Sequence, residues 1–295
     1  MSIEKKYDFA VILSVKNANP NGDPLNGNRP RTNYDNVGEI SDVCLKRKIR
    51  NRLMRMNDPA DSVDILVQSN DNSTDEHQSI KARIDACKDL DMKDAAKFKK
   101  QACEKWYDVR AFGQIFPFKG KASGGGVSIP VRGPVSIHSA YSLEPVNITS
   151  TQITKSTNLE DTKAGKKASD TMGMKHRVDF GIYTFFGSIN AQLASDQTGT
   201  GFSDSDAEKL KIALLSMFEN DASSARPDGS MAVLNVIWWA HSCPSGNISS
   251  AKVHRSLEKN IHPETGAILK REKLTLSYLE NEVTKALKPE ILDGF

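Results

Sequence analysis

The sequence predicts an α+β fold, and three observations lead to that class. Residues 7–15 form an apolar, β-rich run of strand length. The stretches 41–56 and 203–220 each begin with a polar N-cap residue and continue with apolar residues at helical spacing. Residues 177–193 and 231–241 return to strand composition. With a further strand-rich segment at 128–146, the order is strand, helix, strand, strand, helix, strand, which is that of a ferredoxin-like or RNA-recognition-motif core.

The first strand is followed by a loop and a helix. The loop, 17–30, is rich in Asn, Gly and Pro. The helix is expected to begin at Ser41 or Asp42, either of which can cap it, and to continue to Met56 because no Gly or Pro interrupts it. Its apolar residues form a stripe about 80° wide on a helical wheel: Leu45, Ile49, Leu53 and Met56.

Two insertions and a tail surround this core. Residues 61–68 are predicted to form a short strand, and 76–108 show apolar residues at roughly helical spacing, so we expect a helical subdomain over 57–127. The second insertion, near 150–176, is too long and too polar for an ordinary connection within a compact domain. The tail, 251–295, is predicted to form two helices that close over the core.

Composition excludes several classes of protein. The net charge is only +3, so the distribution of charge matters more than its sum. No apolar run approaches the roughly 18 residues that span a bilayer, and no signal peptide is visible, so we expect a soluble, cytoplasmic protein without membrane contacts. Four cysteines without CxxC spacing indicate reduced thiols. Dispersed histidines and the absence of a P-loop motif predict no metal, no cofactor and no catalytic residue.

The predicted helix at 41–56 is unusually basic. It carries six Lys or Arg side chains between positions 46 and 55, whereas Asp42 is the only acid from 41 to 57. Such cations repel one another unless a polyanion lies across them, and those that neutralise phosphates give sequence-independent affinity. The alternative is a solvated helix face. The cations flank the apolar stripe on two sides: Lys46, Arg47 and Arg50 on one, Lys48, Arg52 and Arg55 on the other.

The loop before this helix adds polar side chains of two kinds. Asp23 and Asp35 could assist attack by a 2′-hydroxyl or position a metal, although a turn-forming role is favoured for each. Amide and guanidinium groups could hydrogen-bond phosphate and sugar, with turn chemistry as the alternative. These residues are Asn17, Asn19, Arg29 and Arg31.

The long polar insertion has the character of an arm. Met172, Met174 and His176 alternate at its end and lead directly into a strand, as the return strand of a long hairpin would. Soft or flat groups at that place could wedge between bases while lysines hold phosphates. A disordered surface loop is the alternative. The lysines concerned are Lys166, Lys167 and Lys175.

Four segments, taken in order and spacing, resemble the crRNA-binding backbone subunit of the type I-C Cascade complex, which belongs to the Cas7 family in the RAMP superfamily of CRISPR-associated proteins. They are "FAVILSVKNANPNGDP", "SDVCLKRKIRN", "VRGPVSIHSAYSLEPV" and "TMGMKHRVDFGIYTFFGSINA". The resemblance implies a modified RNA-recognition-motif palm with an inserted helical finger and a β-hairpin thumb. The palm would comprise 1–56, 128–149 and 177–250, the finger 57–127, the thumb 150–176, and the C-terminal helices 251–295.

The resemblance also implies a function. Copies would stack head to tail along crRNA into a helical filament, and each thumb would kink the guide, so that pairing reads the target DNA strand. The expected partners are crRNA, the target DNA strand, further copies of the chain and other Cascade subunits. The contacts implied by the resemblance are Asn17, Asn19, Arg29, Lys46, Arg47 and Arg50 for guide phosphate and sugar, and Met172, Met174 and His176 for the kink. The residues add further candidates: Arg31 for the guide, Lys166, Lys167 and Lys175 for the thumb, and Lys48, Arg52 and Arg55 for target DNA or an adjacent subunit.

Two alternatives remain at this point. Related backbone subunits of type III complexes cut target RNA with an Asp in the loop after strand one, which keeps Asp23 and Asp35 as candidates for a ribonuclease. A solitary RNA-binding module that does not oligomerise would share the basic helix and differ in its mass on RNA.

Overall fold

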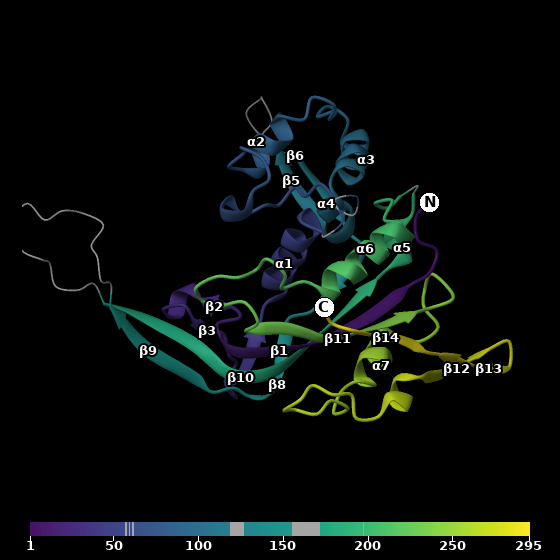
Figure 1. Cartoon of the computed structure of the whole chain (residues 1–295). Helices are drawn as coiled ribbons and strands as arrows, with labels where there is room; N and C mark the ends of the chain where they lie inside the picture. The colour runs from purple at the N-terminus through teal and green to yellow at the C-terminus, as the bar shows by residue number, and fades with distance from the viewer. Residues whose placement is uncertain (57, 59, 61, 119–126, 155–171, 197) are drawn as a thin grey trace, which may run out of the picture.

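A large antiparallel sheet organises the chain, for which the computed structural model describes all residues except 57, 59, 61, 119–126, 155–171 and 197 (Figure 1). The sheet has eight strands among the described residues, within a mixed α+β fold. Shorter strands β7 (Val135–Ile137) and β9 (Ile148–Thr154) pair with opposite ends of β10. The order across the sheet is β14 (Pro289–Asp293), β11 (Met231–Ala240), β1 (Tyr7–Ala18), β10 (Met172–Ile189), β8 (Ala140–Pro145) and β4 (Val37–Ile40).

The central strand β1 is buried on both faces. Val11 and Leu13 point into one hydrophobic cluster, whereas Ala10 and Ile12 point into a second cluster on the opposite face. The strand pairs with β10 on one side and β11 on the other. Because neither face meets water from Phe9 to Leu13, this part of β1 is a continuous apolar run instead of an alternating one.

Two helices cover one face of the sheet. Helix α1 (Asp42–Met54) begins at Ser41, whose hydroxyl caps it by accepting from the Cys44 N–H, as predicted. Helix α6 (Asp204–Leu215) begins with a capping box between Ser203 and Asp206. Apolar side chains of both helices join the cluster that contains Val11 and Leu13. No helix in the part of the chain that the structure describes is long and apolar enough to cross a bilayer.

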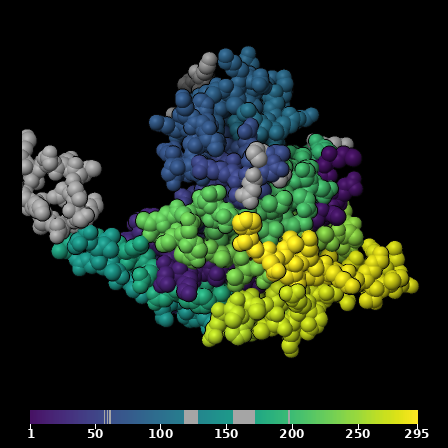
Figure 2. Space-filling view, viewed as in Figure 1, coloured from purple at the N-terminus to yellow at the C-terminus, as the bar shows by residue number. Residues whose placement is uncertain are grey.

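A smaller unit stands above the sheet and has a hydrophobic cluster of its own, centred on Phe98, Trp106 and Phe116 (Figures 1 and 2). The helices predicted within 76–108 are present. The strand predicted at 61–68 is wrong, since the described residues 62–68 contain none and the Leu66 and Val67 amides donate instead to Asp108. The unit contains η3 (Asn70–Asn72), α2 (Ile80–Asp85), α3 (Ala95–Lys105), α4 (Tyr107–Phe112) and the hairpin of β5 (Gly113–Phe118) with β6 (Val127–Arg132).

The tail corrects a second prediction, because 251–295 does not form two helices. After the short α7 (Ser250–Arg255) and η4 (Arg271–Leu274), the chain forms the hairpin β12 (Leu276–Glu280) and β13 (Val283–Leu287) and then β14. Asn281 and Glu282 connect this hairpin with φ of 50° and 65°. A two-residue loop with both φ angles positive matches the twist of the two strands of a hairpin. Because a right-handed helix needs negative φ, no helix can continue through these two residues.

A two-stranded arm projects from one end of the sheet (Figures 1 and 2). It consists of β9 and the first part of β10, paired from Ile148 opposite Val178 to Thr154 opposite Met172. The arm continues the central strand β10 outward, so its root is fixed in the core: Val178 is fully buried. The return strand predicted for the polar insertion is therefore present.

Candidate nucleic-acid interface

Two of the six cations between positions 46 and 55 are buried. Lys48 is 1% exposed and Arg52 is 3% exposed. Lys48 forms an ion pair with Asp221, and Arg52 donates from Nε to the Ser216 hydroxyl at 2.8 Å. In this fold α6 and the chain that follows it cover this flank, so both side chains support the packing of α1. Their contact with target DNA or an adjacent subunit stays a prediction. Arg55, on the same flank, is exposed.

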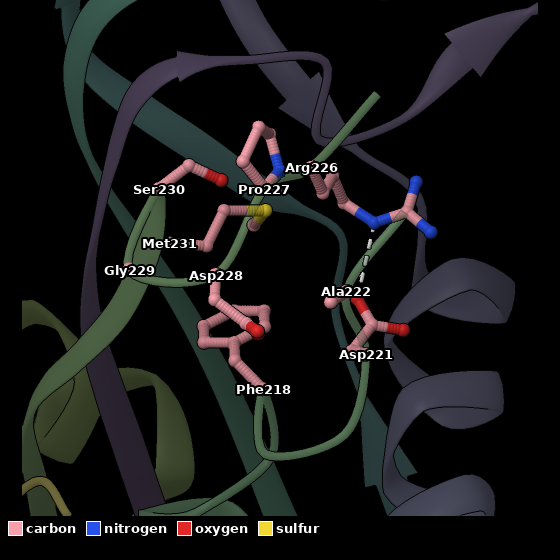
Figure 3. A pocket seen from close by; sticks show the side chains of 9 residues that line it. All are labelled: Phe218, Asp221, Ala222, Arg226, Pro227, Asp228, Gly229, Ser230 and Met231. Atoms are coloured by element: carbon pink, nitrogen blue, oxygen red, sulfur yellow. Dashed lines mark hydrogen bonds and ion pairs between the residues drawn. The ribbon is translucent and has the colours of Figure 1, made fainter. Parts of the chain in front are cut away.

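Asp221 holds the loop between α6 and β11 against α1 (Figure 3). One of its carboxylate oxygens accepts from Arg226 Nε at 3.1 Å and also pairs with Lys48. Burial lowers the pKa of the Lys48 ammonium, and the charge of Asp221 opposes that change. The pocket beside this pair has a volume of about 20 Å³, which suits a single water molecule and excludes a larger ligand.

The opposite flank of α1 is partly engaged with acids. Lys46 pairs with Asp42 one turn earlier at 3.0 Å. Arg50 donates from Nε to Asp108 of the smaller unit at 2.9 Å, and the Asp108 side chain is buried. Arg47 is exposed. Of the three cations assigned to guide phosphates, Arg47 is thus the most accessible, and Arg50 joins two parts of the fold.

The Asn-rich loop is shaped by its own side chains. Asn19 is 7% exposed, and its amide donates to the Asn28 carbonyl at 2.6 Å, so it holds the loop in shape. Its contact with the guide stays a prediction. Asn17 is exposed and holds a positive φ of 53° at the end of β1. Asn21 accepts from the amide and the hydroxyl of Ser41, which ties the loop to the start of α1.

The two loop acids take different positions. Asp23 caps the short helix η1 (Pro24–Asn26), which lies between β2 (Gly22–Asp23) and β3 (Arg29–Pro30), and pairs with Arg31 at 3.4 Å. Asp35 is exposed, and its amide donates to the side chain of Asn33. Both fit turn formation. Within the described ranges, no group of three His, Cys, Asp or Glu residues could hold a metal ion.

The arm has two chemically different faces. Met172 and Met174 are 67% and 56% exposed and share one face with His176, because alternate residues of a strand point the same way. Lys175 points to the other face, opposite Thr151. The predicted contacts therefore divide between two faces. Met172, Met174 and His176 form the soft face, named for its polarizable thioethers, and Lys175 lies on the cationic face. Lys166 and Lys167 lie outside the described residues.

The soft face of the arm meets the Asn-rich loop at its root. Arg29 donates from Nη1 to the Ser150 hydroxyl of β9 at 3.0 Å. The same hydroxyl lies 2.8 Å from Nδ1 of His176, its direct partner across the ladder. Loop, arm and the start of α1 thus form one continuous surface. Sequence reasoning missed Ser150, since only the strand register places it between two predicted contact residues.

This surface combines exposed guanidinium and amide donors with exposed thioethers beside an imidazole. Donors of this kind bind phosphate and sugar without reading sequence, and soft apolar groups can displace a base from its stack. These are the side-chain properties predicted for a surface that holds a nucleic-acid backbone and interrupts its stacking.

The chain belongs to the Cas7 family, since the family model described as "CRISPR-associated protein Cas7" matches residues 5–278. A curated relative, the CRISPR-associated protein Cas7 of Haloferax volcanii, is 25% identical over 240 residues, which cover 76% of this chain and 67% of that protein.

Two solved structures that partly superpose on this chain have titles that name CRISPR complexes. One titled "CRISPR RNA-guided surveillance complex" is 15% identical with a TM-score of 0.48, and the match covers 91% of this chain and 80% of the other. Another, the type III-B Cmr-beta complex bound to cognate target RNA, is 10% identical with a TM-score of 0.38, over 79% and 60% of the two chains. Because both scores are below 0.5, the family assignment rests on the family model.

Proposed function

We propose that this protein is a crRNA-binding backbone subunit of a type I-C Cascade complex and that it works in the cytoplasm. Copies would assemble head to tail along the guide, beside other Cascade subunits, and present the guide to the target DNA strand. The observation that carries the proposal is the continuous surface of loop, α1 and arm in a chain of the Cas7 family.

In this proposal the main sheet is a palm related to the RNA-recognition motif. Its support is the order β11, β1, β10, β8 across the sheet, with α1 and α6 on one face. The smaller unit is the finger, predicted at 57–127 and extended by β6 to Arg132, and its support is a separate hydrophobic cluster. The arm is the thumb, predicted at 150–176 and paired from Ile148 opposite Val178 outward.

The proposed contacts follow accessibility. Asn17, Arg29 and Arg47 hold guide phosphate and sugar, with Lys46 and Arg31 available where RNA competes with their carboxylate partners. On the arm, Met172, Met174 and His176 displace a base, and Lys166, Lys167 and Lys175 remain predicted phosphate contacts. Arg55 remains a candidate contact for target DNA or an adjacent subunit.

We assign the subunit no covalent chemistry. Asp23 serves as the cap of a turn and as the partner of Arg31, which favours a structural role over ribonuclease activity. A protein that holds only phosphate and sugar accepts any guide sequence and leaves recognition of the target to base pairing.

The test is the particle mass of the purified protein with single-stranded RNAs of increasing length. A backbone subunit gives masses that rise stepwise as each additional copy finds room on the RNA. A solitary binding module gives one copy on the shortest RNA and no regular steps afterwards. A mass independent of RNA under all conditions would contradict the proposal, and cleavage of a complementary RNA that Asp23→Ala abolishes would show the ribonuclease alternative.

A further inference from the structure

We propose that Ser150 is a positioning residue that fixes the angle between the Asn-rich loop and the arm, and so decides where the arm meets the guide. The inference rests on the proposed function and adds to it a residue that touches neither α1 nor the outer part of the arm. It starts from one hydroxyl that three elements share: β3 through Arg29, β9 through Ser150 and β10 through His176.

A hydroxyl between a guanidinium and an imidazole can accept one hydrogen bond and donate another. A guanidinium has only donors, so the Ser150 oxygen must accept from Arg29. The hydroxyl also has a hydrogen of its own, which it can donate to Nδ1 of His176 when the ring proton is on Nε2. Ser150 therefore links two side chains that would otherwise be independent.

Because this link lies at the root of the arm, it influences the direction in which the arm projects. Ser150 faces His176 two residues from Val178, where β10 leaves the buried core. Met174 and Met172 follow on the same face farther out, so a small change of angle at the root moves both thioethers by a larger distance. Farther out, as far as Thr154 and Met172, the ladder joins β9 to β10 and so keeps the described part of the arm straight.

Ser150 is exposed, so its replacement removes no buried group and should leave the fold intact. The variants are Ser150→Ala, which removes the hydroxyl, and Ser150→Thr, which keeps it and suits a strand. Ser277→Ala is the matched control, because Ser277 is likewise an exposed strand serine but lies in the C-terminal hairpin.

The experiment scans 2-aminopurine through a guide-length RNA, one position at a time, since its fluorescence rises where a base is unstacked. Wild type, Ser277→Ala and Ser150→Thr should show maxima at regular intervals. Ser150→Ala should assemble on the RNA with an unchanged salt dependence but lose the regular maxima. Arg29→Ala should lose them too, and adding Ser150→Ala to Arg29→Ala should cause no further loss.

Three results would overturn the inference. The first is a Ser150→Ala protein whose maxima equal those of the wild type. The second is an effect of Ser150→Ala that adds independently to that of Arg29→Ala. The third is an assembled wild type without regular maxima. Failure of the wild type to assemble on any RNA would overturn the proposed function, and this inference with it, before a variant is compared.

Discussion

Arg47 is the cation on α1 that the fold leaves most available to a guide. Lys46 and Arg50 point to the same flank but already pair with Asp42 and Asp108. Arg47→Ala should weaken RNA binding by a similar factor for every sequence and reduce the slope of log affinity against log salt by about one, since one phosphate contact is lost.

Binding isotherms at four or more salt concentrations measure this slope. The control is Lys252→Ala, which removes an exposed lysine from α7 on the opposite side of the sheet. Equal slopes of log affinity against log salt for Arg47→Ala and Lys252→Ala would contradict the assignment of α1 to the interface.

The buried carboxyl group of Asp8 should make the free energy of unfolding depend on pH. Burial alone would raise the pKa of this carboxyl, but hydrogen bonds with His241, Ser188 and Ser250 and the charge of Lys6 together lower it to about 2. His241 donates to it from Nε2 at 2.9 Å, because Nδ1 accepts from the Asn247 amide.

A folded-state pKa below the unfolded value means that the carboxylate stabilises the fold above the unfolded pKa. That contribution, about 2 kcal/mol, should be fully present above pH ~4 and should disappear as the pH falls towards ~2. Urea denaturation across this range measures it. Asp8→Asn, which cannot ionise, should lose less stability than the wild type over the same interval, and parallel curves would contradict the assignment.

The burial of Lys48 and Arg52 shows what residue patterns could and could not predict. On a helical wheel Arg52 lies about 20° from Leu45 and Lys48 about 60° from it, so both border the apolar stripe. That proximity was a usable sign of burial. The partners were not predictable, since Asp221 and Ser216 are far away in sequence and reach α1 only through the packing of α6.

At the scale of elements, the sequence predicted the segments with strong and long patterns. Strands β1, β10 and β11 and helices α1 and α6 are each long enough for their periodicity to identify them. The segment at 62–68 was not predictable in the same way. Its apolar residues suit a strand, but Asp108 takes two of its amides, and that contact depends on the tertiary fold.

The segment 155–171, which connects β9 to β10 in the predicted thumb, is the part of the chain whose removal should separate folding from assembly. Replacing 155–171 with Asn-Gly would join Thr154 to Met172, which already face each other across the ladder, through a two-residue turn. The shortened protein should unfold at nearly the same temperature as the wild type, because the arm beyond Val178 adds little to the core. It should form few long assemblies on RNA.

Thermal unfolding and sedimentation with guide RNA measure the two properties. Full-length assemblies from the shortened protein would contradict the assignment of the arm. A large fall in melting temperature would instead show that the replaced segment belongs to the core.

At the scale of the whole molecule, ion pairs connect the smaller unit to the helices that cover the sheet. Arg50 of α1 binds Asp108, and Arg110 of α4 binds Asp206 of α6 at 2.7 Å. Arg50→Ala should cost about 3 kcal/mol, because it leaves a buried carboxylate without its cation. Hydrogen exchange of the Leu66 and Val67 amides, which share that carboxylate, should also accelerate.

Chemical denaturation and amide exchange check this prediction. Lys100→Ala is the control, since its pair with Glu104 is exposed and should contribute below ~1 kcal/mol. If the two variants lose equal stability, the Arg50 pair does not join the units.

The last strand of the sheet also affects how the chain folds while it is being translated. β14 covers the outer edge of β11, whose sequence MAVLNVIWWA is strongly apolar. Until 289–293 have left the ribosome, β11 presents an open edge that can pair with another nascent chain. The yield of well-folded protein should therefore depend on chaperone supply during translation more than on the stability of the finished sheet.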